Sequence, residues 1–111
     1  MVQAIYENVE EIVSRFINEL EKHIRVERVI LFGSYARGTP RPFSDIDLIV
    51  ISPDFHGGTL EDHMLLAKVA RLITPQIEAL PYLPQDFKET DPRSFEGGLL
   101  RDGKMIYPKA A

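Results

Sequence analysis

The stretch Leu31–Val50 reads LFGSYARGTPRPFSDIDLIV. It places Gly33 and Ser34 directly after one apolar run, and Asp45 and Asp47 at the start of a second. Carboxylates beside a buried strand are costly unless another group compensates their charge. The stretch therefore predicts both the frame of the fold and the position of a site.

The segments around this stretch predict alternating helices and strands. Apolar residues at steps of three and four predict an amphipathic helix over about residues 4–24. The β-branched run Val26–Phe32 predicts a strand, and SYARG after it allows at most one helical turn. Prolines exclude regular structure from the loop TPRPF, residues 39–43. The continuous apolar run of Asp45–Ser52 predicts a strand buried on both faces.

The second half of the chain continues the alternation. Thr59 followed by Asp62 is typical of a helix N-cap, and the helical spacing extends to about residue 73. Gln76–Leu83 predicts a third strand, and Pro81, which lacks an N–H, favours either a sheet edge or a bulge there. Short helical segments are predicted within residues 84–90 and 92–100, and a last short strand at residues 105–107. We expect one domain over residues 1–111, of class α/β (α+β), with a small mixed sheet of three to four strands flanked by helices.

Composition narrows the classes of function. The chain has 111 residues, 44% of them hydrophobic and 27% charged, as in an ordinary globular domain. A net charge of −4 argues against a broad nucleic-acid surface. With no cysteine, thiolate catalysis and cysteine-ligated zinc are excluded. No apolar run reaches the roughly 18–20 residues of a membrane span, and the acidic N-terminus is unlike a signal peptide, which predicts a cytoplasmic protein.

Asp45 and Asp47 carry the chemistry of the predicted site. Alternate residues of a strand point to the same face, so both carboxylates project together. Two close carboxylates repel each other unless cations bind, and hard cations such as Mg²⁺ prefer oxygen ligands. A paired-metal site is therefore predicted here. Gly33 allows a close backbone approach, and Ser34 adds a hydroxyl for binding an anion such as phosphate.

GSYARGTPRPFSDIDL resembles the signature of the DNA polymerase β-like nucleotidyltransferase superfamily. That signature is Gly-Ser, about ten residues, then Asp-x-Asp, and Tyr35–Ser44 supply the ten. The segments ARG and SDIDL are most similar to the minimal nucleotidyltransferase (MNT) branch. The motif covers about a fifth of the chain, and the order of elements extends the resemblance over most of the rest.

The resemblance implies Mg²⁺-dependent transfer of a nucleoside monophosphate from an NTP to a hydroxyl, with release of pyrophosphate. Gly33 and Ser34 would hold the triphosphate, and Asp45 and Asp47 would ligate two Mg²⁺ ions. The third carboxylate of the family, usually an Asp on a later strand, matches Glu78 in QIEAL, which would be a further metal ligand or the base. Glutamate is one methylene longer than the usual aspartate, and Asp86 is the alternative.

Other side chains of the same stretch have competing interpretations. Arg37 and Arg41 could supply a fixed cation to the phosphates, or could be plain surface arginines. Ser44 could contact a ligand, or bond its own backbone as a turn residue. Plain structural interpretations also exist for the other site residues. Ser34 could act only as a helix N-cap, the two aspartates could cap a loop, and Glu78 could sit on an exposed strand face. The three histidines share no ligand spacing, and we expect core or partner contacts for Tyr82, Phe87 and Phe95.

Three functions remain open. MNT proteins resemble antitoxins encoded beside HEPN-domain proteins, which implies transfer of AMP from ATP to a hydroxyl on a HEPN partner and silencing of the RNase activity of that partner. The Glu78 departure motivates a degenerate binding module that neutralises its partner by contact alone. A small-molecule nucleotidyltransferase is the third, and its missing substrate-binding elements would have to come from a partner or from a second copy in a homo-oligomer.

Overall fold

The elements of the chain follow the predicted alternation. The computed structural model describes residues 2–41, 44–88 and 90–108. Its elements are α1 (Val2–Leu20), β1 (Arg28–Phe32), α2 (Ser34–Arg37), β2 (Ile46–Ile51), α3 (Leu60–Ile73), β3 (Ile77–Tyr82), the 3-10 helix η1 (Pro84–Phe87), α4 (Phe95–Asp102) and β4 (Lys104–Tyr107). Within the predicted loop TPRPF, residues 42 and 43 lie outside the described residues.

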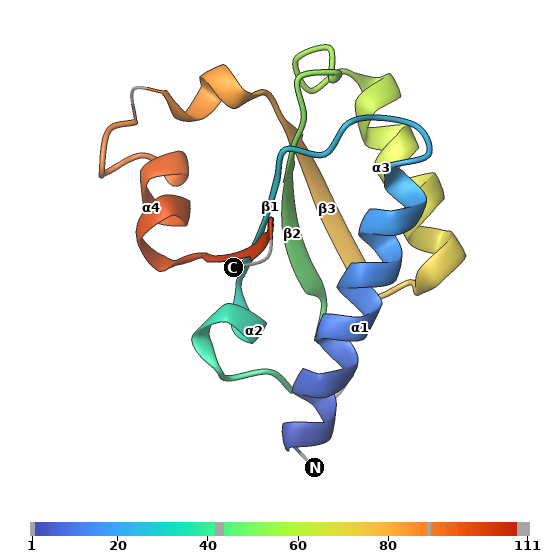
Figure 1. Cartoon of the computed structure of the whole chain (residues 1–111). Coiled ribbons are helices and arrows are strands. Elements are labelled where there is room, and N and C mark those ends of the chain that lie inside the picture. The colour runs from blue at the N-terminus through green and yellow to red at the C-terminus, as the bar shows by residue number, and fades with distance from the viewer. Residues whose placement is uncertain (1, 42–43, 89, 109–111) are drawn as a thin grey trace.

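The four strands form one mixed sheet in the order β3-β2-β1-β4. β2 pairs in parallel with β3, whereas β1 is antiparallel to both β2 and β4. The mixed sheet flanked by helices confirms the predicted fold class, and β3, which contains Pro81, lies at a sheet edge as predicted. Helices α1 and α3 cover one face of the sheet, and α4 lies on the other (Figure 1).

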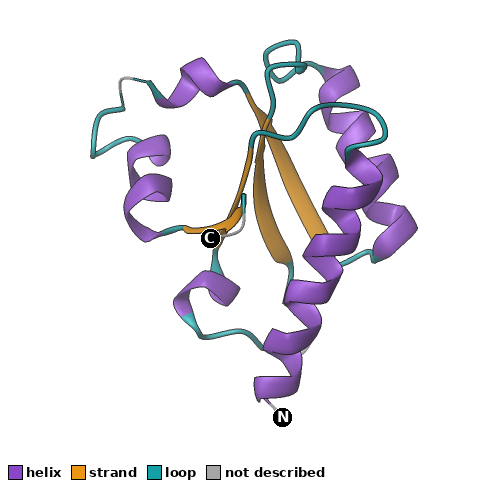
Figure 2. Cartoon of the chain, viewed as in Figure 1, coloured by secondary structure: helices purple, strands orange, loops and turns teal. Residues whose placement is uncertain are grey.

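Both faces of the sheet are apolar, as the continuous apolar run of β2 predicts. On the first face Leu48 and Val50 belong to a buried cluster with Phe16 of α1 and Leu66 of α3. On the second face lies a smaller cluster, which consists of Ile30, Ile49, Ile51 and Leu99. Because side chains alternate along a strand, Asp47 lies on the second face, the one towards α4. Figure 2 shows the strands with helices on both sides.

Helix α1 ends at Leu20, short of the predicted residue 24. The carboxylate of Asp54 accepts a hydrogen bond from the backbone N of Arg25 at 2.8 Å and pairs with the guanidinium of the same residue at 2.9 Å. Between the helix and this contact the chain continues in hydrogen-bonded turns, in which the backbone N of His23 and of Ile24 donate to the carbonyl of Leu20 at 2.9 and 3.1 Å. Among the described residues, no helix is both long and apolar enough to cross a membrane.

The predicted N-cap of α3 is confirmed. The Thr59 hydroxyl accepts a hydrogen bond from the backbone N of Asp62 at 3.4 Å, and the Asp62 carboxylate accepts one from the backbone N of Thr59 at 3.2 Å. The same carboxylate accepts further bonds from the backbone N of His56 at 2.8 Å and of Gly58 at 3.0 Å. Asp62 is only 4% exposed, so this acid holds the turn before α3 from inside the protein.

Asp62→Asn should lower the free energy of unfolding by about 2 kcal/mol at pH 7, because a charge-assisted acceptor of several N–H groups is lost. Burial raises the pKa of Asp62, but the N–H groups of His56, Thr59 and Gly58 outweigh it and hold the pKa below its usual range. Such a carboxylate stabilises the fold above its unfolded pKa, and this contribution is lost as the pH falls through the folded pKa.

Urea denaturation from pH 7 to pH 3 tests this expectation. The difference in unfolding free energy between wild type and Asp62→Asn should narrow below about pH 4, where the wild-type acid begins to protonate. Glu61→Gln is the control, because Glu61 is an exposed acid in the same turn. A difference of constant size across the whole pH range would contradict the assigned role of the charge.

Candidate functional site

Three acids gather at one end of the sheet. Asp47 of β2 pairs in register with Glu78 of the parallel strand β3, so both side chains lie on the α4 face. Asp45 stands immediately before β2, two residues from Asp47. Alternation therefore directs Asp45 to the same face, in agreement with the sequence prediction.

Gln76 ties the starts of the two parallel strands together. Its backbone carbonyl accepts a hydrogen bond from the N of Ile46 at 2.8 Å. Its side-chain Nε2 donates to the carbonyl of Ser44 at 3.3 Å. The sequence analysis missed this positioning residue, since a single Gln before a strand gives no signal of its own. Its contacts hold the register that sets Glu78 opposite Asp47.

Burial and neighbouring charges shift the pKa of the Asp47 carboxyl. Partial burial, and then the negative charges of Asp45 and Glu78, raise the pKa of the Asp47 carboxyl, while the positive charge of Arg37 lowers it. No described residue donates a hydrogen bond to this carboxylate. The cluster thus carries unbalanced negative charge, and a bound cation would relieve it.

The donor set fits magnesium. Among the described residues, no group of three or more His, Cys, Asp or Glu is gathered closely enough to enclose a metal ion. The carboxylates of Asp45 and Asp47 supply hard oxygen ligands on one side only, and Glu78 is exposed on the edge strand. Mg²⁺ commonly binds through one or two carboxylates and keeps several waters, so this open arrangement suits it.

Gly33 is required by its contact with Asp47. Its φ is +74°, in the left-handed region, and a Cβ built on it would overlap Oδ2 of Asp47. The sequence analysis expects a glycine here for close approach to a phosphate. In the structure, the Asp47 carboxylate occupies the space that a side chain at position 33 would fill. This contact joins the Gly-Ser segment and the Asp-x-Asp segment into one site.

Ser34 is the first residue of α2, whose N-cap position belongs to Gly33, so the interpretation of Ser34 as the cap is wrong. Within the described parts of the chain, its hydroxyl has no hydrogen-bond partner. Ser44 does bond its own turn, because its Oγ accepts from the backbone N of Arg41 at 2.7 Å. Contact of either hydroxyl with a ligand stays a prediction.

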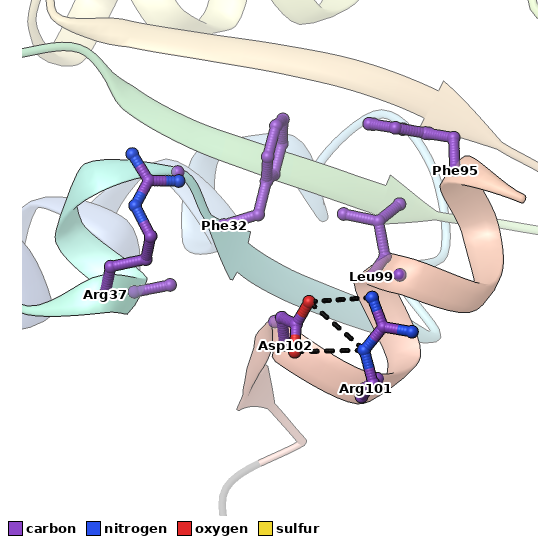
Figure 3. Close-up of a pocket in the computed structure, with 10 residues that line it drawn as sticks. Phe32, Arg37, Phe95, Leu99, Arg101 and Asp102 are labelled. Carbon is purple, nitrogen blue, oxygen red and sulfur yellow. Dashed lines mark hydrogen bonds and ion pairs between the residues drawn. The ribbon is translucent and has the colours of Figure 1, made fainter. Parts of the chain in front are cut away.

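A cavity of about 700 Å³ opens beside Gly33, between α2, the end of β1 and α4. Its walls include Gly33, Ala36 and Arg37 on one side and Phe95, Gly98 and Leu99 on the other, with Phe32 in the middle (Figure 3). Arg101, Asp102 and Gly103 complete the lining.

The structure separates the two candidate arginines and the two candidate third acids. Arg37 lines the cavity and its charge reaches Asp47, whereas Arg41 is exposed and outside the lining. Asp86, the alternative third acid, accepts a hydrogen bond from the backbone N of Leu83 at 2.8 Å and so caps η1. Glu78 is the acid that the sheet brings to Asp47.

The sequence analysis missed the wall that α4 provides. Of the two roles predicted for Phe95, the core role is wrong, because this side chain is 51% exposed and meets Phe32 edge to face, with ring centroids 6.0 Å apart. A partner contact stays a prediction. Tyr82 and Phe87 do pack together, at 5.3 Å between ring centroids. The pair Gly97–Gly98 was the available signal, since glycines inside a helix are unfavourable without a packing reason.

Comparison with known proteins extends these findings. A family model described as a nucleotidyltransferase domain matches residues 13–96. A protein of Methanocaldococcus jannaschii, provisionally named a protein adenylyltransferase, is 31% identical over 103 residues, which cover 90% of this chain and 99% of that protein. A second protein of that organism, with the same kind of name, is 33% identical over 85 residues, covering 73% of this chain and 58% of the relative.

Two solved structures share the fold. A provisionally named nucleotidyltransferase from Sulfolobus solfataricus superposes with a TM-score of 0.68 at 18% identity, over 94% of this chain and 84% of that one. A toxin–antitoxin structure with AMP-PNP superposes with a TM-score of 0.59 at 23% identity, over 85% of this chain and 71% of that one. At identities of 18% and 23%, the superpositions show a shared fold alone.

Proposed function

Because the chain belongs to the nucleotidyltransferase domain family, we propose that it transfers the nucleoside monophosphate of an NTP, AMP from ATP, to a hydroxyl on a partner protein. The observation that carries this proposal is the contact between Gly33 and the Asp47 carboxylate, at which Asp45 and Glu78 add further negative charge. It supports the proposal because Gly33, the proposed phosphate-binding residue, and Asp47, a proposed metal ligand, lie against each other.

The residues of the site have distinct tasks in this reaction. Two Mg²⁺ ions held by Asp45 and Asp47 would supply neutralisation of the phosphate charge. Gly33 and Ser34 bind the triphosphate, and Arg37 adds a cation close to it. Glu78 accepts the proton of the acceptor hydroxyl. The acceptor oxygen bonds to the α-phosphorus, the bond from that phosphorus to the bridging oxygen breaks, and pyrophosphate leaves.

A protein substrate is favoured by the names of the relatives. The relatives from Methanocaldococcus jannaschii are provisionally named protein adenylyltransferases, and the toxin–antitoxin structure contains a nucleotide analogue. We propose a HEPN-domain protein as the partner and an antitoxin role for this chain, in the cytoplasm where ATP and Mg²⁺ are available.

A contact-only antitoxin is the second candidate. It is favoured by Glu78, which is longer than the usual aspartate and exposed on the edge strand. In that case the chain would neutralise its partner by binding alone. Glu78 therefore decides between the two candidates.

Transfer of label from α-labelled ATP to a HEPN partner tests the proposal. We expect a labelled partner in the presence of Mg²⁺, no label in EDTA, and transfer reduced by about 100-fold in Glu78→Gln, within the range for loss of a positioned base. Glu78→Asp, which restores the usual residue of the family, is the matched variant and should retain more transfer than Glu78→Gln. An unlabelled partner whose RNase is still neutralised would favour the contact-only module instead.

A further inference from the structure

The cavity beside Gly33 is mainly apolar and aromatic, although it borders a charged site. Phe32 and Phe95 form an edge-to-face aromatic pair, and Leu99 lies next to them. The side chain of Phe95 is 51% exposed, so its ring is accessible to a ligand in the cavity. Figure 3 shows Arg37 on the other side of Phe32 from Phe95.

The cavity lies at a defined position relative to the acids. In the sheet, β1 stands between β4 and β2, and β3 lies beyond β2. Phe32 of β1 pairs in register with Asp47 of β2, which pairs with Glu78 of β3, so the three side chains share the α4 face. The cavity, the candidate metal ligand and the candidate base thus follow one another across the sheet.

We propose that this cavity binds the nucleobase and ribose of the NTP, with Phe95 and Phe32 as the aromatic contact surface for the base. The inference rests on the proposed function and adds to it the site of the nucleoside. The wall formed by Phe32, Phe95 and Leu99 does not suit phosphates, which would lie at the Gly33 and Arg37 part of the lining. The acceptor hydroxyl would approach from the other side of Asp47, where Glu78 is exposed.

Size and chemistry support this assignment. A volume of about 700 Å³ lies within the usual range for small-molecule sites, which are mostly apolar with a few polar groups. Every nucleobase presents a flat π face that stacks on aromatic side chains. At the rim, the guanidinium of Arg101 is paired with Asp102 at 3.1 Å and also donates to the carbonyl of Pro92 at 3.3 Å, which fixes this side of the cavity.

Gly98 allows the cavity to be filled without disturbing the fold. A Cβ at this position would meet only Nη2 of Arg101, at 3.8 Å, which is an ordinary van der Waals distance. At the neighbouring Gly97 a Cβ would overlap the backbone of Asp91 and Pro92. Gly98→Leu should therefore place a side chain in the cavity, and Ala67→Leu, on the exposed side of α3, is the control for added bulk.

Calorimetry with two probes tests the proposal, each in the presence of Mg²⁺: ATP and inorganic tripolyphosphate. Wild type should bind ATP at least about tenfold more tightly than tripolyphosphate. Gly98→Leu should lose that advantage and keep its affinity for tripolyphosphate, whereas Ala67→Leu should behave as wild type. If Gly98→Leu binds ATP like the wild type, the nucleoside lies elsewhere and the inference is wrong, while the proposed transfer stands. If wild type binds neither probe, the proposed function itself fails.

Phe95→Ala provides a second variant should Gly98→Leu fail to fold. Loss of one stacking contact should weaken ATP binding by about tenfold, since stacking contributes roughly 1–3 kcal/mol per base, and should leave tripolyphosphate binding unchanged. Leu100→Ala is the matched control, because Leu100 lies on the same helix, is 44% exposed and is outside the cavity lining. Equal ATP affinity in both variants would overturn the role of Phe95.

Discussion

Asp47→Asn should reduce nucleotidyl transfer by about a thousandfold or more, because binding and charge stabilisation by a metal contribute several kcal/mol to such a transition state. The same change should leave the metal-free protein more stable than the wild type at neutral pH. Activity falls and stability rises for the same reason. The negative charge of Asp47 is required to bind the metal, but it is repelled by the neighbouring acids when no metal is bound.

The sign of the stability effect follows from the raised pKa of Asp47, which partial burial, Asp45 and Glu78 produce against the opposing charge of Arg37. A carboxyl whose pKa is raised in the folded state binds protons more strongly there than in the unfolded chain. The free energy of unfolding therefore falls as the pH rises through the interval between the two pKa values. Asparagine removes this loss, so the advantage of the variant should appear at neutral pH and vanish below about pH 4.

Thermal unfolding in EDTA measures the stability effect, and thermal unfolding in Mg²⁺ measures the loss of metal binding. In EDTA at about pH 7.5, well above the ordinary aspartate pKa of about 4, the variant should have a higher melting temperature than the wild type. Added Mg²⁺ should raise the melting temperature of the wild type only. Asp54→Asn is the contrasting control, because Arg25 lowers the pKa of Asp54 and its neutralisation should destabilise the fold at neutral pH. A variant of Asp47 that melts lower in EDTA and still transfers label would refute the role assigned to this acid.

Gly33→Ala should reduce transfer by about 100-fold through displacement of the Asp47 carboxylate, since a shift of about 1 Å in a catalytic group can have an effect of that size. The added Cβ would overlap Oδ2 of Asp47, and the φ of +74° would be strained for alanine. We also expect about 1–2 kcal/mol of destabilisation from the left-handed backbone.

Gly57→Ala separates backbone strain from displacement of the Asp47 carboxylate. Gly57 has a φ of +87°, so alanine is strained there as well, but no atom lies within 4 Å of its Cβ position. Both variants should melt below the wild type, and only Gly33→Ala should lose transfer and Mg²⁺ stabilisation. If the two variants transfer equally well, the contact between Gly33 and Asp47 has no part in the reaction.

Local patterns were sufficient for most of the elements. The cap formed by Thr59 and Asp62, the edge position of the strand with Pro81, and the buried strand β2 all follow from a few neighbouring residues. The end of α1 does not, because the apolar spacing continues past Leu20 into residues that form hydrogen-bonded turns and not a further regular α-helix.

The sequence by itself determined which residues could form a site: Gly33 and Ser34, the pair Asp45 and Asp47, and a later acid. Their types favour phosphates and hard cations as ligands. Only the tertiary structure decided how these groups meet. Parallel pairing across α3 sets Glu78 opposite Asp47, the turn at Gly33 places its Cα against that carboxylate, and the return of α4 to the sheet forms the cavity. The physical reason is that register and cavity shape depend on contacts between segments far apart in the chain, whereas alternation and capping act within a few residues.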